Sequence, residues 1–92
     1  MKFEVRVEVR LRPGIADPQG ATIERALPAL GFHGVEGMRV GKVMRFTVEA
    51  ADETAARAEA GAMCERLLAN PVIEDADIEI KAGIEIRAGV LR

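Results

Sequence analysis

The first twelve residues alternate between apolar and charged side chains. The apolar positions are Phe3, Val5, Val7, Val9 and Leu11, and a charged residue stands at every position between them. This period of two predicts a strand over 2–12 with one buried face and one solvated face. At about 3.3 Å per residue the strand exceeds the usual length. We therefore expect it to run beyond its own sheet and to leave an edge for another subunit.

The segment 11–20 then changes the period of the pattern. Pro13 removes a backbone donor and Gly14 accepts turn conformations, so the strand ends here. Asp17 followed by Pro18 is typical of a helix start, with a carboxylate cap and proline at the first helical position. This connection is rich in special residues and is the first candidate for a partner surface.

Helical spacing replaces alternation over 18–30. The apolar residues stand at i, i+3, i+4 and i+7, namely Ile23, Ala26, Leu27 and Leu30. Gly31 follows as the expected left-handed cap. Pro28 lies inside the segment and predicts a distorted last turn, because it cannot donate to the carbonyl of Glu24.

The second half of the chain repeats the alternation of elements. We expect a hairpin of strands 35–39 and 43–49 around Val40-Gly41-Lys42. Asp52 begins a second helix, which ends at Asn70-Pro71, before a last strand over 72–82. The stripe expected to be buried on that helix consists of Ala56, Ala60, Met63, Cys64 and Leu67.

The order strand, helix, strand, strand, helix, strand predicts an α+β fold. We expect a two-layer, ferredoxin-like (split βαβ) sandwich with both helices on one face of an antiparallel sheet. Residues 1–82 form the predicted domain and 83–92 a C-terminal extension with a possible extra strand. Its Ile84-Glu85-Ile86-Arg87-Ala88-Gly89 repeats residues 78–83 closely. The second copy could extend the strand, fold back, or join a neighbouring subunit.

Composition excludes several classes of function. The 92 residues suffice for one domain with a modest core, and 49% of them are hydrophobic. A net charge of −2, three phenylalanines and no tryptophan or tyrosine give no footprint for nucleic acid. No apolar run is long enough to span a membrane. With a single cysteine and no export signal, we expect a cytoplasmic protein.

Candidate chemistry is sparse. Gly31, Gly34 and Gly37 follow a helix and precede a strand, which is the reverse of a dinucleotide fingerprint. His33 has no ligand at metal-binding spacing, and the acidic residues 74–79 lack the pattern of a calcium loop. No nucleophile has a plausible base, so the residues alone favour binding or assembly over catalysis.

Three segments resemble the PurS family, the small subunits of phosphoribosylformylglycinamidine synthase. Residues 11–20 are similar to the family's "LKPGVLDPQG", and Gly41-Lys42 matches its central glycine-lysine. Cys64 and residues 67–74 match "C-x-x-LLANPVIE". The blocks fall in order up to about residue 82. Pro28, Ala76 (commonly tyrosine in the family) and residues 83–92 depart from the family pattern.

The resemblance implies a non-catalytic subunit in the fourth step of purine biosynthesis. It implies a homodimer or homotetramer that bridges a glutaminase subunit (PurQ) and a synthetase subunit (PurL) and supports ammonia transfer. ATP and magnesium would be used by the synthetase, with no cofactor, nucleic acid or membrane bound here. An ACT-like module that binds a small regulatory ligand is the alternative, because it shares this order of elements.

The resemblance also implies interface roles for eight residues. Five of them also suit turns and caps, namely Pro13, Asp17, Gly20, Asn70 and Pro71. No turn or cap requires the other three, Arg12, Gln19 and Lys42. These three are therefore the stronger candidates for contact with a partner.

Overall fold

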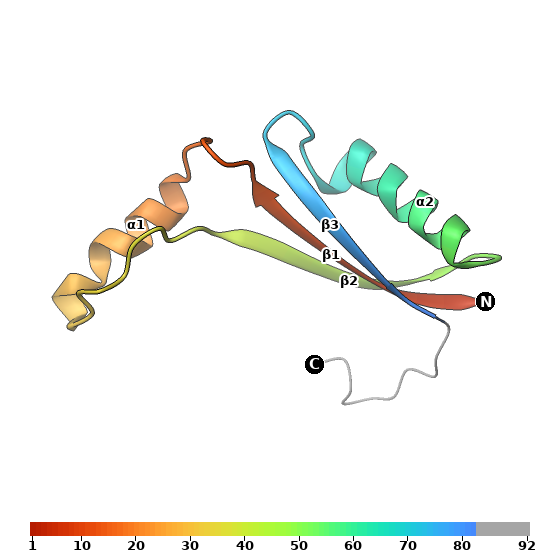
Figure 1. Cartoon of the computed structure of the whole chain (residues 1–92), viewed down its shortest axis with the longest axis horizontal. Helices are drawn as coiled ribbons and strands as arrows, with labels where there is room; N and C mark the ends of the chain where they lie inside the picture. The colour runs from red at the N-terminus through yellow and green to blue at the C-terminus, as the bar shows by residue number, and fades with distance from the viewer. Residues whose placement is uncertain (83–92) are drawn as a thin grey trace.

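β1 (Lys2–Leu11) is the central strand of a three-stranded antiparallel sheet. It lies between β2 (Gly41–Glu49) and β3 (Glu74–Lys81), so that Val7 stands opposite Met44 on one side and Ile78 on the other (Figure 1). The computed structural model describes residues 1–82, and the predicted C-terminal extension 83–92 lies outside the described residues. The α+β class, with an antiparallel sheet and two helices, is confirmed.

The core forms where the alternating pattern of β1 meets the second helix. The side chains of Phe3, Val5, Val7 and Val9 are at most 2% exposed. Because β1 is paired along both edges, the prediction that it runs beyond its sheet is wrong. Within residues 1–82 the unpaired edges belong to β2 and β3 instead.

α2 (Glu53–Met63) packs its small residues onto β1 and β3. Ala56 and Ala60 are fully buried, and the side chain of Asp52 caps the helix by accepting from the Ala55 backbone N–H at 2.8 Å. The predicted burial of Ala56 and Ala60 is therefore confirmed.

A π-helical turn over Cys64–Leu68 ends this helix and corrects the predicted stripe. The Ala69 N–H donates to the Cys64 carbonyl at 3.0 Å, a bond that spans five residues and widens the turn. Cys64 stays buried, but Leu67 is 83% exposed, and Leu68 packs against the core in its place.

The chain between β1 and β2 forms an arm (residues 12–40) that projects beyond the end of the sheet (Figure 1). It contains α1 (Pro18–Ala26) and a 3₁₀ turn, η1 (Pro28–Leu30), so Pro28 interrupts the helix as predicted. Gly31 takes the left-handed conformation of a cap. The molecule consequently measures 51 × 34 × 16 Å.

Two fold predictions that concern the arm are wrong. Residues 32–40 form no strand, so the expected hairpin is the single strand β2. The helices do not share one face of the sheet: α2 covers the sheet, whereas the one buried residue of α1 is Gly20. The physical reason is that the backbone N–H groups of the segment 38–40 donate to carboxylates within the arm. Met38 donates to Glu24 and Val40 donates to Asp17, so these groups do not pair with a neighbouring strand.

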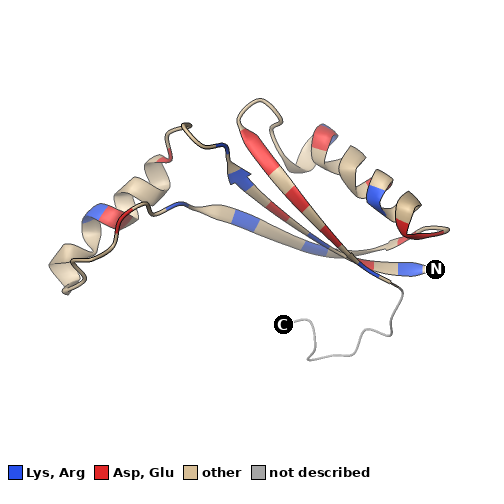
Figure 2. Ribbon diagram, viewed as in Figure 1, with Lys and Arg blue, Asp and Glu red and all other residues tan. Residues whose placement is uncertain are grey.

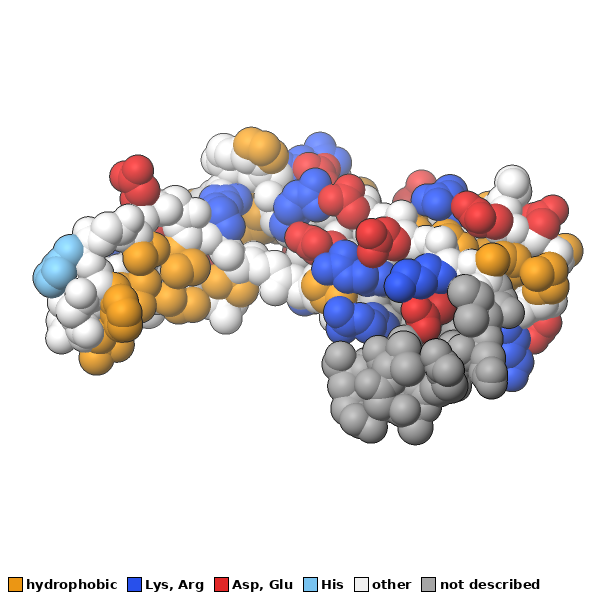
Figure 3. Space-filling view, turned by 60° about the horizontal axis from the view of Figure 1, so that its bottom comes forward, with side chains coloured by type: hydrophobic (Ala, Val, Ile, Leu, Met, Phe, Trp, Pro, Cys, Tyr) orange, Lys and Arg blue, Asp and Glu red, His pale blue; other side chains and the backbone are white. Residues whose placement is uncertain are grey.

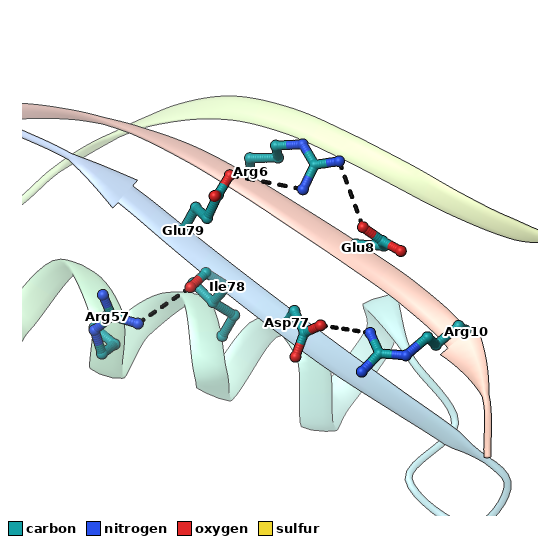
Figure 4. Close-up of polar contacts among 7 residues, drawn as sticks. All are labelled: Arg6, Glu8, Arg10, Arg57, Asp77, Ile78 and Glu79. Carbon is teal, nitrogen blue, oxygen red and sulfur yellow. Dashed lines mark hydrogen bonds and ion pairs between the residues drawn. The ribbon is translucent and has the colours of Figure 1, made fainter. Parts of the chain in front are cut away.

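The sheet face opposite α2 is charged. Figure 2 shows acidic residues along β3 beside basic residues of β1. Arg6 pairs with Glu79 at 3.6 Å, and Arg10 pairs with Asp77 (Figure 4). Exposed pairs of this kind contribute little stability, but they agree with the strand register. None of the helices within residues 1–82 is long and apolar enough to cross a bilayer.

Candidate partner interface

Asp17 fastens the two sides of the arm to each other. Its carboxylate caps α1 by accepting from the Gly20 N–H at 2.9 Å, and it also accepts from the Val40 N–H at 2.8 Å. These two bonds, with the nearby positive charge of Arg39, hold the pKa of the Asp17 carboxyl below its ordinary value. The predicted cap is confirmed, and the second bond adds a contact across 23 residues that spacing alone could not reveal.

Gly20 is present because the returning chain leaves no room for a side chain. A Cβ atom here would lie 2.4 Å from the carbonyl oxygen of Met38, a distance that real Cβ atoms do not show. Glu24 completes this contact, since its Oε1 accepts from the Met38 N–H at 2.8 Å. Gly20 therefore has a structural role inside the arm.

Arg39 joins the two ends of the arm to each other, and Arg12 joins the arm to β3 and to the loop before it. Arg39 donates to the carbonyls of Ile15 and Arg12 at 3.1 and 3.3 Å. Arg12 donates to the Pro71 carbonyl and forms an ion pair with Asp75 at 3.2 Å. Arg12 thus has structural contacts that the sequence did not indicate, although about half of its side chain remains exposed.

Asn70 and Pro71 form the turn that leads into β3. The Asn70 Oδ1 accepts from the Val72 N–H at 3.1 Å, and its backbone N–H donates to Glu74 at 2.6 Å. Pro13 begins the exposed turn that follows the C-terminal end of β1, at the same end of the sheet, where Gly14 has a φ of 86°. These residues shape the chain around the candidate interface.

Gln19 and Lys42 come together at the junction of the arm and the sheet. Both line an open pocket of about 300 Å³, with Asp17 and Glu74 on its wall. Neither side chain has a polar partner among residues 1–82, and both residues are exposed. Of the three stronger candidates, these two have no polar partner in residues 1–82, whereas Arg12 is engaged with Pro71 and Asp75.

An apolar candidate surface on the arm was missed by the sequence analysis. Figure 3 shows hydrophobic side chains gathered on the outer part of the arm. Ile23 and Leu30, both on the apolar face that the spacing predicts, are 39% and 70% exposed. Phe32 and Val35, which follow the helix, are 57% and 42% exposed. The helical spacing of α1 was the available signal, but it identified an apolar face without showing what covers it.

Comparison with known proteins now decides the family. The model of PurS, phosphoribosylformylglycinamidine (FGAM) synthase, matches residues 4–82. The chain belongs to the PurS family. The match spans the sheet, the arm and α2, so the resemblance drawn from residues 11–20, 41–42 and 64–74 is confirmed. The ACT-like alternative is not favoured.

Individual PurS relatives are similar over nearly the whole described chain. The PurS subunit of Methanothermobacter thermautotrophicus is 46% identical over 80 residues, which cover 87% of this chain and 94% of the relative. The PurS subunit of Synechocystis is 42% identical over 80 residues, which cover 87% of this chain and 80% of the relative. The solved structure of PurLQS from Thermotoga maritima contains a chain that is 33% identical to this one, with a TM-score of 0.80. The match covers 88% of this chain and 99% of that chain.

Proposed function

We propose that this PurS-family chain is the non-catalytic assembly subunit of FGAM synthase. In this proposal it joins the synthetase subunit, PurL, to the glutaminase subunit, PurQ, during the glutamine- and ATP-dependent conversion of the formylglycinamide ribonucleotide to its amidine. The family match and the likeness to a chain of PurLQS support this assignment. We place the assembly in the cytoplasm, and we assign ATP and magnesium to the synthetase subunit.

The polar groups of the candidate interface suit a scaffold better than an active site. Asp17 and Glu24 each accept backbone N–H groups, and Arg12 and Arg39 each donate to backbone carbonyls. Such groups are already committed to holding the arm, which leaves them poorly placed to exchange protons with a substrate.

The observation that carries the proposal is the apolar surface of the arm. Leu30 and Phe32 are more than half exposed on a projection that is fixed internally by hydrogen bonds but has little contact with the sheet. Exposed apolar groups that cluster in this way mark interaction sites. We propose that this surface is buried in the homodimer or homotetramer, and that Gln19 and Lys42 contact a partner at the base of the arm.

The test is reconstitution with a matched pair of variants. Leu30 on the arm is 70% exposed and Val72 near β3 is 77% exposed, so aspartate at either position places a charge on an exposed apolar site. Wild type, Leu30→Asp and Val72→Asp would each be mixed with PurL and PurQ. Complex mass would be measured by light scattering, and amidine formation with glutamine would be compared with amidine formation with free ammonia.

We expect Leu30→Asp to weaken assembly by about 10- to 100-fold, because a charge at a buried contact costs roughly 1–3 kcal/mol. Glutamine-dependent turnover should fall with it, while turnover on free ammonia by PurL should remain. Val72→Asp should behave as wild type. Equal loss in both variants would reject the arm as the surface responsible. No effect of adding wild-type protein on glutamine-dependent turnover would reject the bridging function itself.

A further inference from the structure

The free edge of β2 is long and regular. β2 pairs with β1 continuously from Glu49 to Gly41, without a bulge, and it contains no proline (Figure 1). No strand within residues 1–82 pairs with its other edge. Proteins usually shorten, bend or cover an edge of this kind, because an exposed one recruits another strand. The β2 edge therefore has the features of a pairing surface.

The backbone groups that β2 directs to this edge follow from its contacts with β1. The Ala50 N–H donates to the Met1 carbonyl at 2.9 Å and the Met1 amine donates to the Ala50 carbonyl at 3.0 Å, so these two residues exchange hydrogen bonds. Antiparallel pairing alternates, so the even-numbered residues of β2 direct their backbone groups to β1. The outward groups belong to the odd-numbered residues Val43, Arg45, Thr47 and Glu49.

The apolar face of β2 is incompletely covered. Because α2 lies over β1 and β3, the side chains of Met44, Phe46 and Ala50 are only partly buried, although they pack against the core. Val7, which stands opposite Met44 on β1, is fully buried. A strand added beside β2 would remove more of this apolar surface from water.

The charged face of β2 carries an arginine without a counter-ion. Arg45 stands directly opposite Arg6, and like charges in such positions destabilise a sheet. Arg6 pairs with Glu79 at 3.6 Å, whereas Arg45 has no ion pair among residues 1–82. An acidic residue on the outer side of Arg45 would offset this repulsion. Glu49, which is exposed on the same face of the same strand, has the required charge.

From the backbone groups and side chains of this edge, we infer that β2 pairs antiparallel with β2 of a second copy, around a two-fold axis at Thr47. In this register Arg45 lies opposite Glu49 of the second copy, and the symmetry repeats the ion pair. On the other face Phe46 lies opposite Val48 of the second copy. Outward backbone groups meet outward backbone groups throughout, so the two three-stranded sheets form one continuous sheet.

Charge selects this register over its neighbours. A two-fold axis at Phe46 would place Arg45 opposite Thr47 of the second copy, so no acidic residue would face it directly. An axis at Arg45 would set the two arginines against each other. Of these three registers, the one with its axis at Thr47 gives Arg45 a directly opposite carboxylate.

The β3 edge is less suited to pairing with its own copy. Asp75, Asp77 and Glu79 lie on one face of that strand, so self-pairing would set acidic residues against each other. The outward carbonyl of Ile78 also already accepts from Arg57 at 3.2 Å. These features favour β2 as the edge that joins two copies.

The β2 contact is separate from the apolar surface of the arm. It rests on the homo-oligomer of the proposed function, but not on the contacts with PurL and PurQ. A closed tetramer with two-fold symmetry needs two different self-complementary contacts, and the arm and the β2 edge would supply one each. The β2 edge can therefore be tested on the chain alone.

Amide exchange and intermolecular NOEs test the pairing. In the wild-type chain the N–H groups of Arg45, Thr47 and Glu49 should exchange at least about tenfold slower than in an unpaired strand, since each gains one hydrogen bond. Two differently labelled samples, unfolded and refolded together, should show an NOE between the α-protons of Phe46 and Val48 of different copies. Rapid exchange would overturn the inference, and so would protection without this NOE, which would mean that the same chain covers the edge.

Exchanging the two charges tests the register. Arg45→Glu sets acidic residues against each other between copies, and sedimentation should show self-association weakened by about 10- to 100-fold. Within the chain the new carboxylate would face Arg6, so the protomer itself should not be destabilised. The double variant Arg45→Glu/Glu49→Arg should restore association to within about threefold of wild type.

Two controls separate this contact from other effects. Arg66→Glu makes the same substitution beyond the end of α2 and should leave association unchanged. Leu30→Asp should leave the Arg45 and Thr47 amides protected, because it lies on the arm, so a failure of the arm proposal is distinguished from a failure at this edge. Equal weakening by Arg45→Glu and Arg66→Glu, or no recovery in the double variant, would overturn the register.

Discussion

Gly20→Ala tests whether the arm is held by close backbone contact. The new Cβ would lie 2.4 Å from the Met38 carbonyl oxygen and 2.8 Å from Asp17 Oδ2. Ordinary carbon–oxygen contacts are longer by about 1 Å, so α1 and the segment 38–40 must separate by that amount. The hydrogen bonds from Met38 to Glu24 and from Val40 to Asp17, each 2.8 Å long, would then break.

The expected cost is about 2 kcal/mol. Strain from an added methyl group in a tight contact typically costs about 1–3 kcal/mol, and the helix preference of alanine returns at most about 1 kcal/mol. The loss of the two hydrogen bonds adds to this difference. Because the arm has little contact with the sheet, the loss should appear as local opening of the arm more than as global unfolding.

Amide exchange at Met38 and Val40 measures this opening directly. Both N–H groups donate to carboxylates of the arm, and we expect them to exchange about 30-fold faster in Gly20→Ala. Gly61→Ala is the matched control, because a Cβ there meets no atom within 4 Å. It should stabilise α2 by about 0.5–1 kcal/mol in urea denaturation at fixed protein concentration. Unchanged exchange at both amides in Gly20→Ala would refute the proposed packing of the arm.

Two other variants test the carboxylate and the core. The lowered pKa of Asp17 means that its stabilising effect is present above the ordinary pKa of a carboxyl group, about 3.9, and is lost as the pH falls through the lowered value. The Asp17→Asn variant has a single carboxamide oxygen and cannot accept from both Gly20 and Val40, so the Val40 amide should exchange faster than in wild type at pH 7. In strong acid the exchange rates of variant and wild type should become equal. A difference in exchange rate that stays constant with pH would contradict this. Val7→Ala, at a fully buried position, should destabilise the fold by about 2 kcal/mol in urea, whereas Val72→Ala, 77% exposed, should change it by less than about 0.5 kcal/mol. Similar losses in the two valine variants would contradict the assigned core.

The elements that were predicted correctly are those whose causes are local in sequence. The alternation of β1, the Asp17 and Asp52 caps, and the Gly31 cap depend on neighbours a few residues away. The Pro28 interruption is local as well. The burial of Leu67 was predicted wrongly because a helical repeat was extended through a π-helical turn that adds a residue to the helix.

The candidate interface could be predicted only in part, for a similar reason. Sequence resemblance proposed Gln19 and Lys42 as interface residues, and the structure places both at one pocket. It also identified Arg12 and Gly20, whose contacts with Asp75 and Met38 join residues far apart in the chain. Whether such residues are free for a partner depends on contacts that no spacing reveals.

The sequence by itself determined the class of fold, the alternating faces of β1 and the starts of the helices, because periodicity and caps are short-range properties. The family followed from the resemblance of residues 11–20, 41–42 and 64–74, which the family model confirms. Only the tertiary structure decided where those faces go. The Asp17 and Glu24 carboxylates bind the backbone of Val40 and Met38, so the chain forms an arm where the pattern predicted another strand. The apolar face of α1 consequently points to solvent rather than to the sheet, and that surface is the one we assign to assembly.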